Sequence, residues 1–183
     1  YCPAISNGRI GSAQYVIFGN STGYDYSTDG ASWAASTKNA YSLCIWDNRL
    51  WGIDTGGQLW YTFTVGSGEV NQAVVPLVAN DKCYLFVGPD AAGEPILYCY
   101  TDLGLFAYDA GNDRFIKTAI GALDYDWPYG VGCRVWNGKI YIAQRTAVLE
   151  YDPSSGTARL VGPDRRDGIP TAYLTWVVSM CVT

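Results

Sequence analysis

The 183 residues of this chain include no histidine. Histidine is the usual acid or base at neutral pH and the base in Ser-His-Asp and Cys-His nucleophile systems. Its absence excludes those mechanisms and every His-ligated metal site.

Basic charge is also scarce, with 12 Lys and Arg against 17 Asp and Glu and a net charge of −5. Nucleic-acid binding needs clustered Lys and Arg, whereas the only basic pair, Arg165-Arg166, lies between Asp164 and Asp167. No apolar run approaches the roughly 20 residues that a membrane-spanning helix needs. We therefore expect neither a nucleic-acid nor a membrane partner, and we expect no cofactor.

The six cysteines form no C-x-x-C pair, so a zinc or thioredoxin-type site has no support. Most of them lie in apolar or aromatic runs, where a free Cys behaves as a small buried hydrophobe. Buried thiols are the favoured prediction, and the even count leaves disulfides open. The residues in such runs are Cys44, Cys83, Cys99 and Cys181.

Glycine (21 residues) and aromatic residues (15%) are abundant, which favours β-strands joined by turns. The segment Trp46–Tyr61, WDNRLWGIDTGGQLWY, aligns without a gap with Trp136–Tyr151, WNGKIYIAQRTAVLEY. Asn137-Gly138 favours positive φ at both positions, which predicts a two-residue type I′ hairpin turn. The sequence therefore predicts the same local structure in at least two places.

Looser copies of this turn occur near residues 7 and 80, so four turns begin near residues 7, 47, 80 and 137, with a mean spacing of 43 residues. The longest interval is explained by an insertion at Gly88–Gly104. Each unit closes with a small polar turn and an outer strand, as in AYDAGNDRF and EYDPSSGTA. Because this unit has the size of a four-stranded blade, we predict that residues 1–183 form one all-β domain, a β-propeller of four roughly 43-residue blades.

Two motifs resemble known propeller families. YSTDGASW (Tyr26–Trp33) is similar to a shortened Asp-box of sialidase-like propellers, and WNGKIYI with LEYDP resembles kelch-type propellers. Residues 151–170 also resemble propeller-like proteins of phage tails and environmental phage genomes. The Asp-box resemblance implies a structural turn at the blade periphery, in which Asp29 accepts hydrogen bonds from backbone N–H groups and Trp33 packs beneath.

The ends of the chain suggest repeats that are cut in mid-blade. VSMCVT (Val178–Thr183) aligns with YSLCIW (Tyr41–Trp46), the strand before a turn, and the first residue is Tyr without a signal-peptide pattern. We expect a processed, excised or partial chain. Its partner is then a second copy of itself, its own other end in a shared blade, or the rest of a larger propeller.

The segment ALDYDWPYG contains the best candidate for ligand chemistry. Asp124 and Asp126 lie two residues apart beside Trp127 and Tyr129, and carboxylates next to aromatic rings can bind or hydrolyse a sugar. A plain loop remains an alternative.

Calcium ligation by Asp25 and Asp29, or by Asp164 and Asp167, lacks the spacing of a dedicated calcium loop. We expect structural turns at both places and no metal.

Trp46 and Trp136 occupy the same repeat position and are expected to pack between blades. Trp51 should face with Arg49 and Ile53, because alternate residues of a strand share a face.

The sequence favours a non-catalytic binding or structural module, a virion or surface protein that holds a partner or a glycan, located in a virion or outside the cell rather than in the cytoplasm. Two alternatives stay open. One is a glycosidase-like enzyme that uses carboxylates at the propeller mouth, and the other is an excised fragment that only folds and self-assembles.

Replacing Trp127 by Ala should abolish glycan binding and leave the melting temperature nearly unchanged, because a loop ring that stacks on sugar contributes little to the core. A glycan array combined with thermal melting measures both. Glycosidase turnover that disappears in Asp124→Asn or Asp126→Asn would favour the enzyme instead.

Overall fold

The structure, a computed structural model, describes residues 5–20, 22–77, 83–121, 133–143 and 148–161. Every regular element in these ranges is a β-strand, and the strands form four antiparallel four-stranded sheets. Each sheet takes four strands that are consecutive in sequence. The prediction of an all-β chain with four blade-like repeats is confirmed. No helix in the described ranges could cross a membrane.

We call the sheets blades one to four. Blade one holds β1 (Ile5–Ile10), β2 (Ala13–Asn20), β3 (Gly23–Ser27) and β4 (Ala34–Ser36). Blade two holds β5 (Ser42–Trp46), β6 (Arg49–Ile53), β7 (Gln58–Thr62) and β8 (Val70–Val74). Blade three holds β9 (Cys83–Pro89), β10 (Pro95–Thr101), β11 (Gly104–Asp109) and β12 (Arg114–Lys117). Blade four holds β13 (Cys133–Trp136), β14 (Lys139–Ala143), β15 (Val148–Asp152) and β16 (Thr157–Val161).

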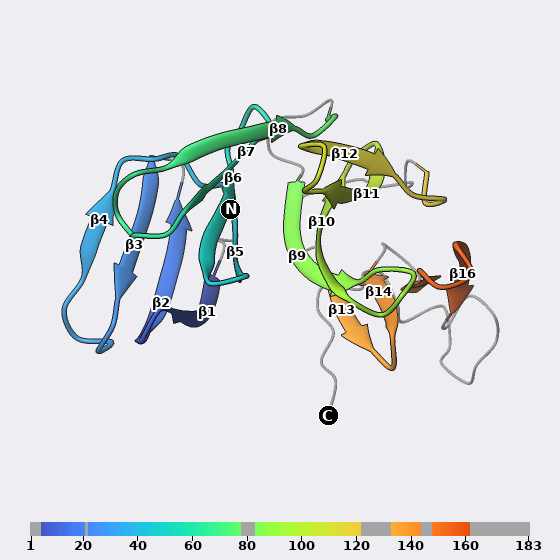
Figure 1. Ribbon diagram of the computed structural model, residues 1–183, viewed down its shortest axis with the longest axis horizontal. Coiled ribbons are helices and arrows are strands. Elements are labelled where there is room, and N and C mark those ends of the chain that lie inside the picture. The colour runs from blue at the N-terminus through green and yellow to red at the C-terminus, as the bar shows by residue number, and fades with distance from the viewer. Residues whose placement is uncertain (1–4, 21, 78–82, 122–132, 144–147, 162–183) are drawn as a thin grey trace, which may run out of the picture.

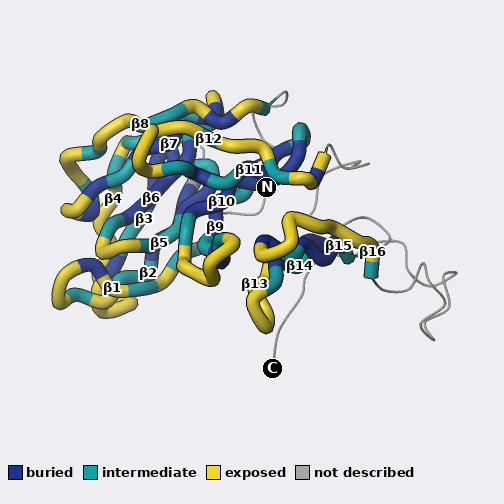
Figure 2. Tube along the Cα trace, turned by 45° about the vertical axis from the view of Figure 1, so that its right-hand side comes forward, coloured by how far each residue is buried: buried dark blue, intermediate teal, exposed yellow. Residues whose placement is uncertain are grey.

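The blades fan out in an arc, from β4 at one end to β16 at the other (Figure 1). The first strands lie next to one another, β1 beside β5, β5 beside β9 and β9 beside β13. Buried residues gather in the middle strands of the blades, and exposed ones on the last strands and the turns (Figure 2). Each blade thus turns one sheet face toward the next blade, as propeller blades do.

Three hydrophobic clusters fill the three junctions between blades. Blade three shows why its strands are so apolar. In β10, Leu97 and Cys99 pack toward blade two, while Tyr98 and Tyr100 pack toward blade four. Because successive side chains of a strand point to opposite faces, a strand that is buried on both faces must be apolar throughout.

Polar side chains also join neighbouring blades. The Tyr24 hydroxyl of blade one accepts a hydrogen bond from the Gly66 N–H at 2.9 Å and donates to Glu69 at 3.0 Å. Burial raises the pKa of Tyr24 to about 12, so the hydroxyl stays neutral. Ser42 of blade two accepts from the Leu85 N–H of blade three at 2.8 Å. These bonds satisfy groups that the packing removes from water.

Two of the predicted hairpin turns are confirmed. Asp47 and Asn48 have φ of 49° and 58°, and Asn137 and Gly138 have φ of 50° and 73°, as a type I′ turn requires. Trp136 pairs with Lys139 across the second turn.

The turn predicted near residue 7 is wrong. Asn7 and Gly8 lie inside β1, where Gly8 pairs with Tyr15, and the turn follows at Gly11-Ser12. A Cβ atom on Gly8 would lie 3.1 Å from Ile45 of blade two. Glycine fits here because the next blade approaches closely. The Asn-Gly sequence alone does not distinguish such a contact from a turn.

The first hairpin of blade three also differs from the prediction. The loop between β9 and β10 covers residues 90–94, where Asp90 accepts from the N–H groups of Ala92 and Glu94 at 2.8 and 2.9 Å. The predicted turn near residue 80 lies outside the described residues, and the predicted insertion Gly88–Gly104 contains β10. The first-hairpin loops therefore begin at residues 11, 47, 90 and 137, with spacings close to the predicted 43 residues.

The prediction of ends cut in mid-blade is not met by the described N-terminal part, because β1 is the first strand of a full four-stranded sheet. Residues 178–183, on which the other half of that prediction rested, lie outside the described residues.

The prediction of buried thiols is confirmed for the described cysteines. Cys99 and Cys133 are buried free thiols, Cys83 is buried, and Cys44 is half-buried. Burial raises the pKa of Cys44 to about 12, which makes the thiol unreactive at neutral pH. Cys2 and Cys181 lie outside the described residues.

Replacing Gly52 by Ala should strongly destabilise the fold. A Cβ atom there would lie 2.1 Å from the ring of Trp60, which is fully buried and cannot move aside. We expect a loss of about 1–3 kcal/mol or more in the free energy of unfolding, measured by urea denaturation. Gly121→Ala is the control, because no atom lies within 4 Å of its Cβ position. Equal stability of the two variants would contradict the packing described.

Candidate binding site

The most distinctive described side-chain cluster lies at the first-hairpin end of blade two. Trp46 and Arg49 face each other across the Asp47-Asn48 turn, and Trp51 pairs with Tyr61 across β6 and β7. Because alternate residues of a strand share a face, all these side chains and Phe63 lie on the face toward blade three. We call Trp46, Arg49, Trp51, Tyr61 and Phe63 the Arg49 cluster.

The Arg49 guanidinium lies at the centre of this cluster. Its Cζ atom is 4.7 Å from the ring centroid of Phe63, 4.9 Å from that of Tyr61 and 5.8 Å from that of Trp51. A cation within about 6 Å of a ring centroid is attracted to the ring. The Trp51 indole N–H donates to the Trp46 carbonyl at 3.1 Å, which fixes the inner ring.

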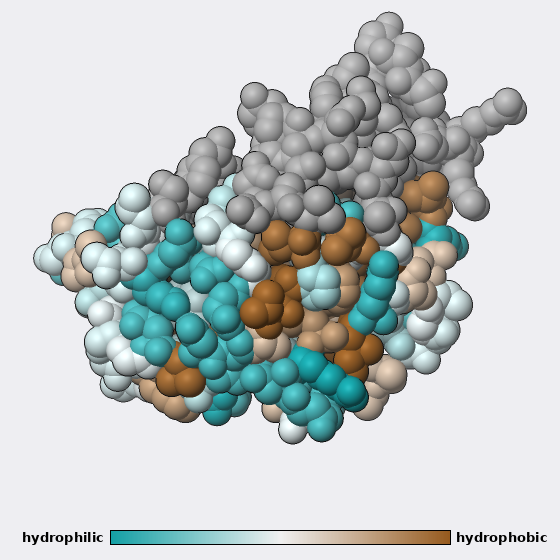
Figure 3. All heavy atoms as spheres, turned by 90° about the horizontal axis from the view of Figure 1, so that it is seen from above, coloured by the Kyte–Doolittle hydropathy of each residue, from teal (hydrophilic) through white to brown (hydrophobic). Residues whose placement is uncertain are grey.

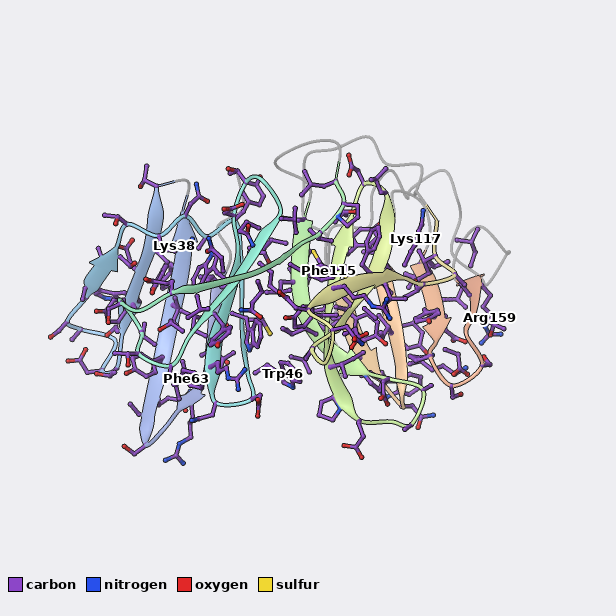
Figure 4. All side chains as sticks on the ribbon, turned by 45° about the horizontal axis from the view of Figure 1, so that its top comes forward. Lys38, Trp46, Phe63, Phe115, Lys117 and Arg159 are labelled. Atoms are coloured by element: carbon purple, nitrogen blue, oxygen red, sulfur yellow. The ribbon has the colours of Figure 1, made fainter. Side chains whose placement is uncertain are left out.

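The cluster is buried at one end and open at the other. Trp51 is only 2% exposed, whereas Phe63 is 56% exposed. The sequence prediction that Trp51 faces with Arg49 and packs in the core is confirmed. Trp46 and Phe63 lie toward the same end of blade two (Figure 4). Aromatic rings therefore run from the core to the surface.

Arg49 has unused hydrogen-bonding capacity. Its Nη2 atom lies 3.6 Å from Asp47 Oδ2, and its buried Nε has no hydrogen-bond partner among the described residues. The side chains of Arg49 and Asp47 are 30% and 62% exposed. Open flat rings beside a guanidinium with free donors can stack on a ligand and donate hydrogen bonds to it.

The residues that the sequence singled out for ligand contact lie elsewhere. Asp124, Asp126, Trp127 and Tyr129 fall between β12 and β13 in sequence, outside the described residues. Their role stays a prediction. The Arg49 cluster was not predicted as a site, although the alternation of Arg49 with Trp51 and of Tyr61 with Phe63 was a signal for it.

The Asp29 turn has the predicted local structure. Asp29 Oδ1 accepts from the N–H groups of Ala31 and Ser32 at 2.8 and 2.7 Å, and these bonds lower the pKa of Asp29 to about 2. Trp33 packs on Phe18 with ring centroids 5.1 Å apart but is 46% exposed. The described residues contain no group of three or more Cys, Asp or Glu side chains suited to a metal ion. Asp164 and Asp167 lie outside them.

The two repeated tryptophans differ in environment. Trp46 is half-buried against the core between blades two and three, as predicted. Trp136 is 54% exposed and touches Tyr141, with ring centroids 6.1 Å apart. Among the described residues Trp136 does not pack between blades, because it lies on the face of blade four that points away from blade three.

That face of blade four carries an ionic network. Tyr141 pairs with Glu150 across the strands, whereas Trp51 pairs with Tyr61 in blade two. Glu150 accepts from Lys139 at 2.8 Å, from Tyr141 at 3.0 Å and from Arg159 at 2.8 and 3.0 Å. The bonds from Arg159 and then Lys139 lower its pKa to about 2. Glu150 is therefore ionised at neutral pH and has no proton to give as a general acid.

Replacing Glu150 by Gln should remove an acid-sensitive part of the stability. The pKa in the folded chain, about 2, lies below the ordinary 4.5, so the contribution of Glu150 is complete above pH 4.5 and is lost as the pH falls toward 2. Urea denaturation across this range should show the stability difference between wild type and Glu150→Gln shrinking with falling pH. Glu94→Gln, in the exposed β9–β10 loop, is the control. A pH-independent difference for Glu150→Gln would contradict the network.

Comparison with known proteins shows the fold. No family model matches the sequence, and no curated protein matches it significantly. The chain is similar to the extracellular domain of the hybrid two-component system BT4673 from B. thetaiotaomicron, with a TM-score of 0.64 and 12% identity over 96% of this chain and 24% of that one. It is similar to the GH74 enzyme of Niastella koreensis, with a TM-score of 0.60 and 15% identity over 85% and 23%.

A third solved structure, YjhT, has a TM-score of 0.58 and 12% identity over 88% of this chain and 65% of that one. The chain thus spans about a quarter of the two larger proteins and about two thirds of YjhT. All three are β-propeller-like proteins. Their likeness and the four antiparallel sheets together identify the fold of this chain as that of β-propeller blades.

Proposed function

We propose that this chain is a non-catalytic binding module of a β-propeller protein, which binds carbohydrate through the open end of the Arg49 cluster. The observation that carries the proposal is the half-exposed ring of Phe63. Its ring centroid lies 5.4 Å from that of Tyr61 and 4.7 Å from the Cζ atom of Arg49. A flat ring that its neighbours already hold in place loses little conformational freedom when a sugar stacks on it.

The state of the described carboxylates supports a non-catalytic role. A general acid needs a pKa near the working pH, whereas the pKa values of Glu150 and Asp29 are lowered to about 2 by their hydrogen bonds. Asp29 accepts hydrogen bonds from backbone N–H groups of its own turn, and Glu150 accepts them from side chains of its own blade, so both carboxylates stabilise local structure. The absence of histidine from the chain removes the commonest alternative.

A location outside the cell is part of the same proposal. Solved structures that resemble this chain include the extracellular domains of BT4673 and BT3049 and an auxiliary nutrient binding protein, all from B. thetaiotaomicron. The likeness is one of fold, so it supports this location and leaves the ligand to be determined by the site.

Replacing Phe63 by Ala should abolish most carbohydrate binding and leave the melting temperature within a few degrees of wild type, because the ring is largely outside the core. A glycan array followed by isothermal titration calorimetry on each hit measures the loss. Val74→Ala, a 58% exposed apolar residue on β8, is the matched control and should bind normally.

Three outcomes would contradict the proposal. Wild type that binds no glycan would remove the function, and unchanged binding by Phe63→Ala would place the site elsewhere. Hydrolysis of a bound glycan would show an enzyme.

A further inference from the structure

We infer that the Arg49 cluster selects a sugar that carries a carboxylate, a hexuronic acid unit of an acidic polysaccharide, and that Asp47 holds the place of this carboxylate in the free protein. The inference rests on the proposed carbohydrate-binding function and adds the class of sugar. It follows from the hydrogen-bonding state of Arg49, the surroundings of its guanidinium and the position of Asp47.

The guanidinium has donors to offer. Arginine carries five N–H donors in a rigid planar fork that matches a carboxylate. The buried Nε of Arg49 has no hydrogen-bond partner among the described residues, and the Asp47 carboxylate lies 3.6 Å from Nη2, beyond hydrogen-bond distance. Asp47 is 62% exposed, and exposed ion pairs of this kind contribute little to stability. A better-placed carboxylate can therefore displace it.

The rings around Arg49 favour a charged ligand over a neutral one. Phe63, Tyr61 and Trp51 exclude water from one side of the guanidinium, and electrostatic attraction is stronger where water is excluded. A carboxylate adds its own charge to these hydrogen bonds and can accept two parallel ones from the guanidinium fork, which a neutral hydroxyl cannot. Sugar hydroxyls can accept hydrogen bonds from Arg49. They are neutral, however, so they leave the positive charge of the guanidinium uncompensated once Asp47 is displaced.

The geometry of the turn makes Asp47 removable. Asp47 has φ of 49°, a conformation that Asn adopts readily. Asp47→Asn therefore keeps the turn and removes the negative charge that competes for Arg49. If Asp47 is a stand-in for the ligand, this variant should bind an acidic sugar more tightly than wild type does. If Asp47 merely anchors Arg49, it should bind no more tightly.

The experiment is isothermal titration calorimetry of the full chain with an oligogalacturonate, with its methyl ester, which has the same rings but no charge, and with a neutral galacto-oligosaccharide. We expect wild type to bind the acid about tenfold more tightly than the ester, as a charge-assisted hydrogen bond predicts. Asp47→Asn should tighten binding of the acid severalfold, and by more than it changes binding of the ester. Arg49→Gln should bind acid and ester equally.

Equal affinity of wild type for acid and ester would overturn the inference, and so would Asp47→Asn without tighter binding of the acid or Arg49→Gln with an intact preference. Thermal melting of each variant establishes that it is folded. If wild type binds the neutral sugar or the ester through Phe63 without preferring the acid, the proposed function stands and the inference fails. If wild type binds none of the three sugars and no glycan of the array, the proposed function fails as well.

Discussion

The packing of one sheet face on the next is the interaction on which this structure depends. A four-stranded blade of some 40 residues is too small to bury its own apolar side chains, so its stability comes from its neighbours. Trp60 of blade two stacks on Tyr24 of blade one at 5.7 Å, and on its inner side it fills the space left by Gly52. On the opposite face, Trp51 meets Tyr108 of blade three at 5.7 Å. Each junction is thus built from residues of two blades.

The candidate binding site is a continuation of this packing. Trp51, Tyr61 and Phe63 follow one another on a single sheet face, from fully buried to half-exposed. Blade three covers the buried part and leaves the hairpin end open. Apolar residues also gather near the middle of the face seen from above, on the side where β8 and β12 run (Figure 3). Val74 and Ile116 of these outer strands are exposed.

Sequence reasoning succeeded where the cause of a structure is local and failed where it is distant. The turns at Asp47-Asn48 and Asn137-Gly138 follow from the residues that tolerate positive φ, and the Asp29 turn follows from a short side chain that reaches its own backbone. Asn7-Gly8 has the sequence of a turn, but Gly8 lies in a strand. A side chain at this position would crowd Ile45, which is 37 residues away in the sequence. The Arg49 cluster was missed because Trp46 was predicted to pack between blades and Phe63 was not considered, and only the position of blade three shows which of these rings stay open. The proposed roles of Trp127 and its neighbours rest on sequence alone.

The pairing of Tyr141 with Glu150 has a consequence for how such blades diverge. Five residues separate Ile53 from its partner Leu59 in blade two, whereas four separate Ala143 from its partner Val148 in blade four. Because the two segments align without a gap, the strand after the loop in blade four pairs one residue earlier than in blade two, and every side chain on it changes face. Tyr151, which matches Tyr61 letter by letter, therefore enters the core, and Glu150 takes the outward place. A shift of one residue in strand register can thus exchange an aromatic face for an ionic one in two repeats whose sequences align without an insertion or a deletion.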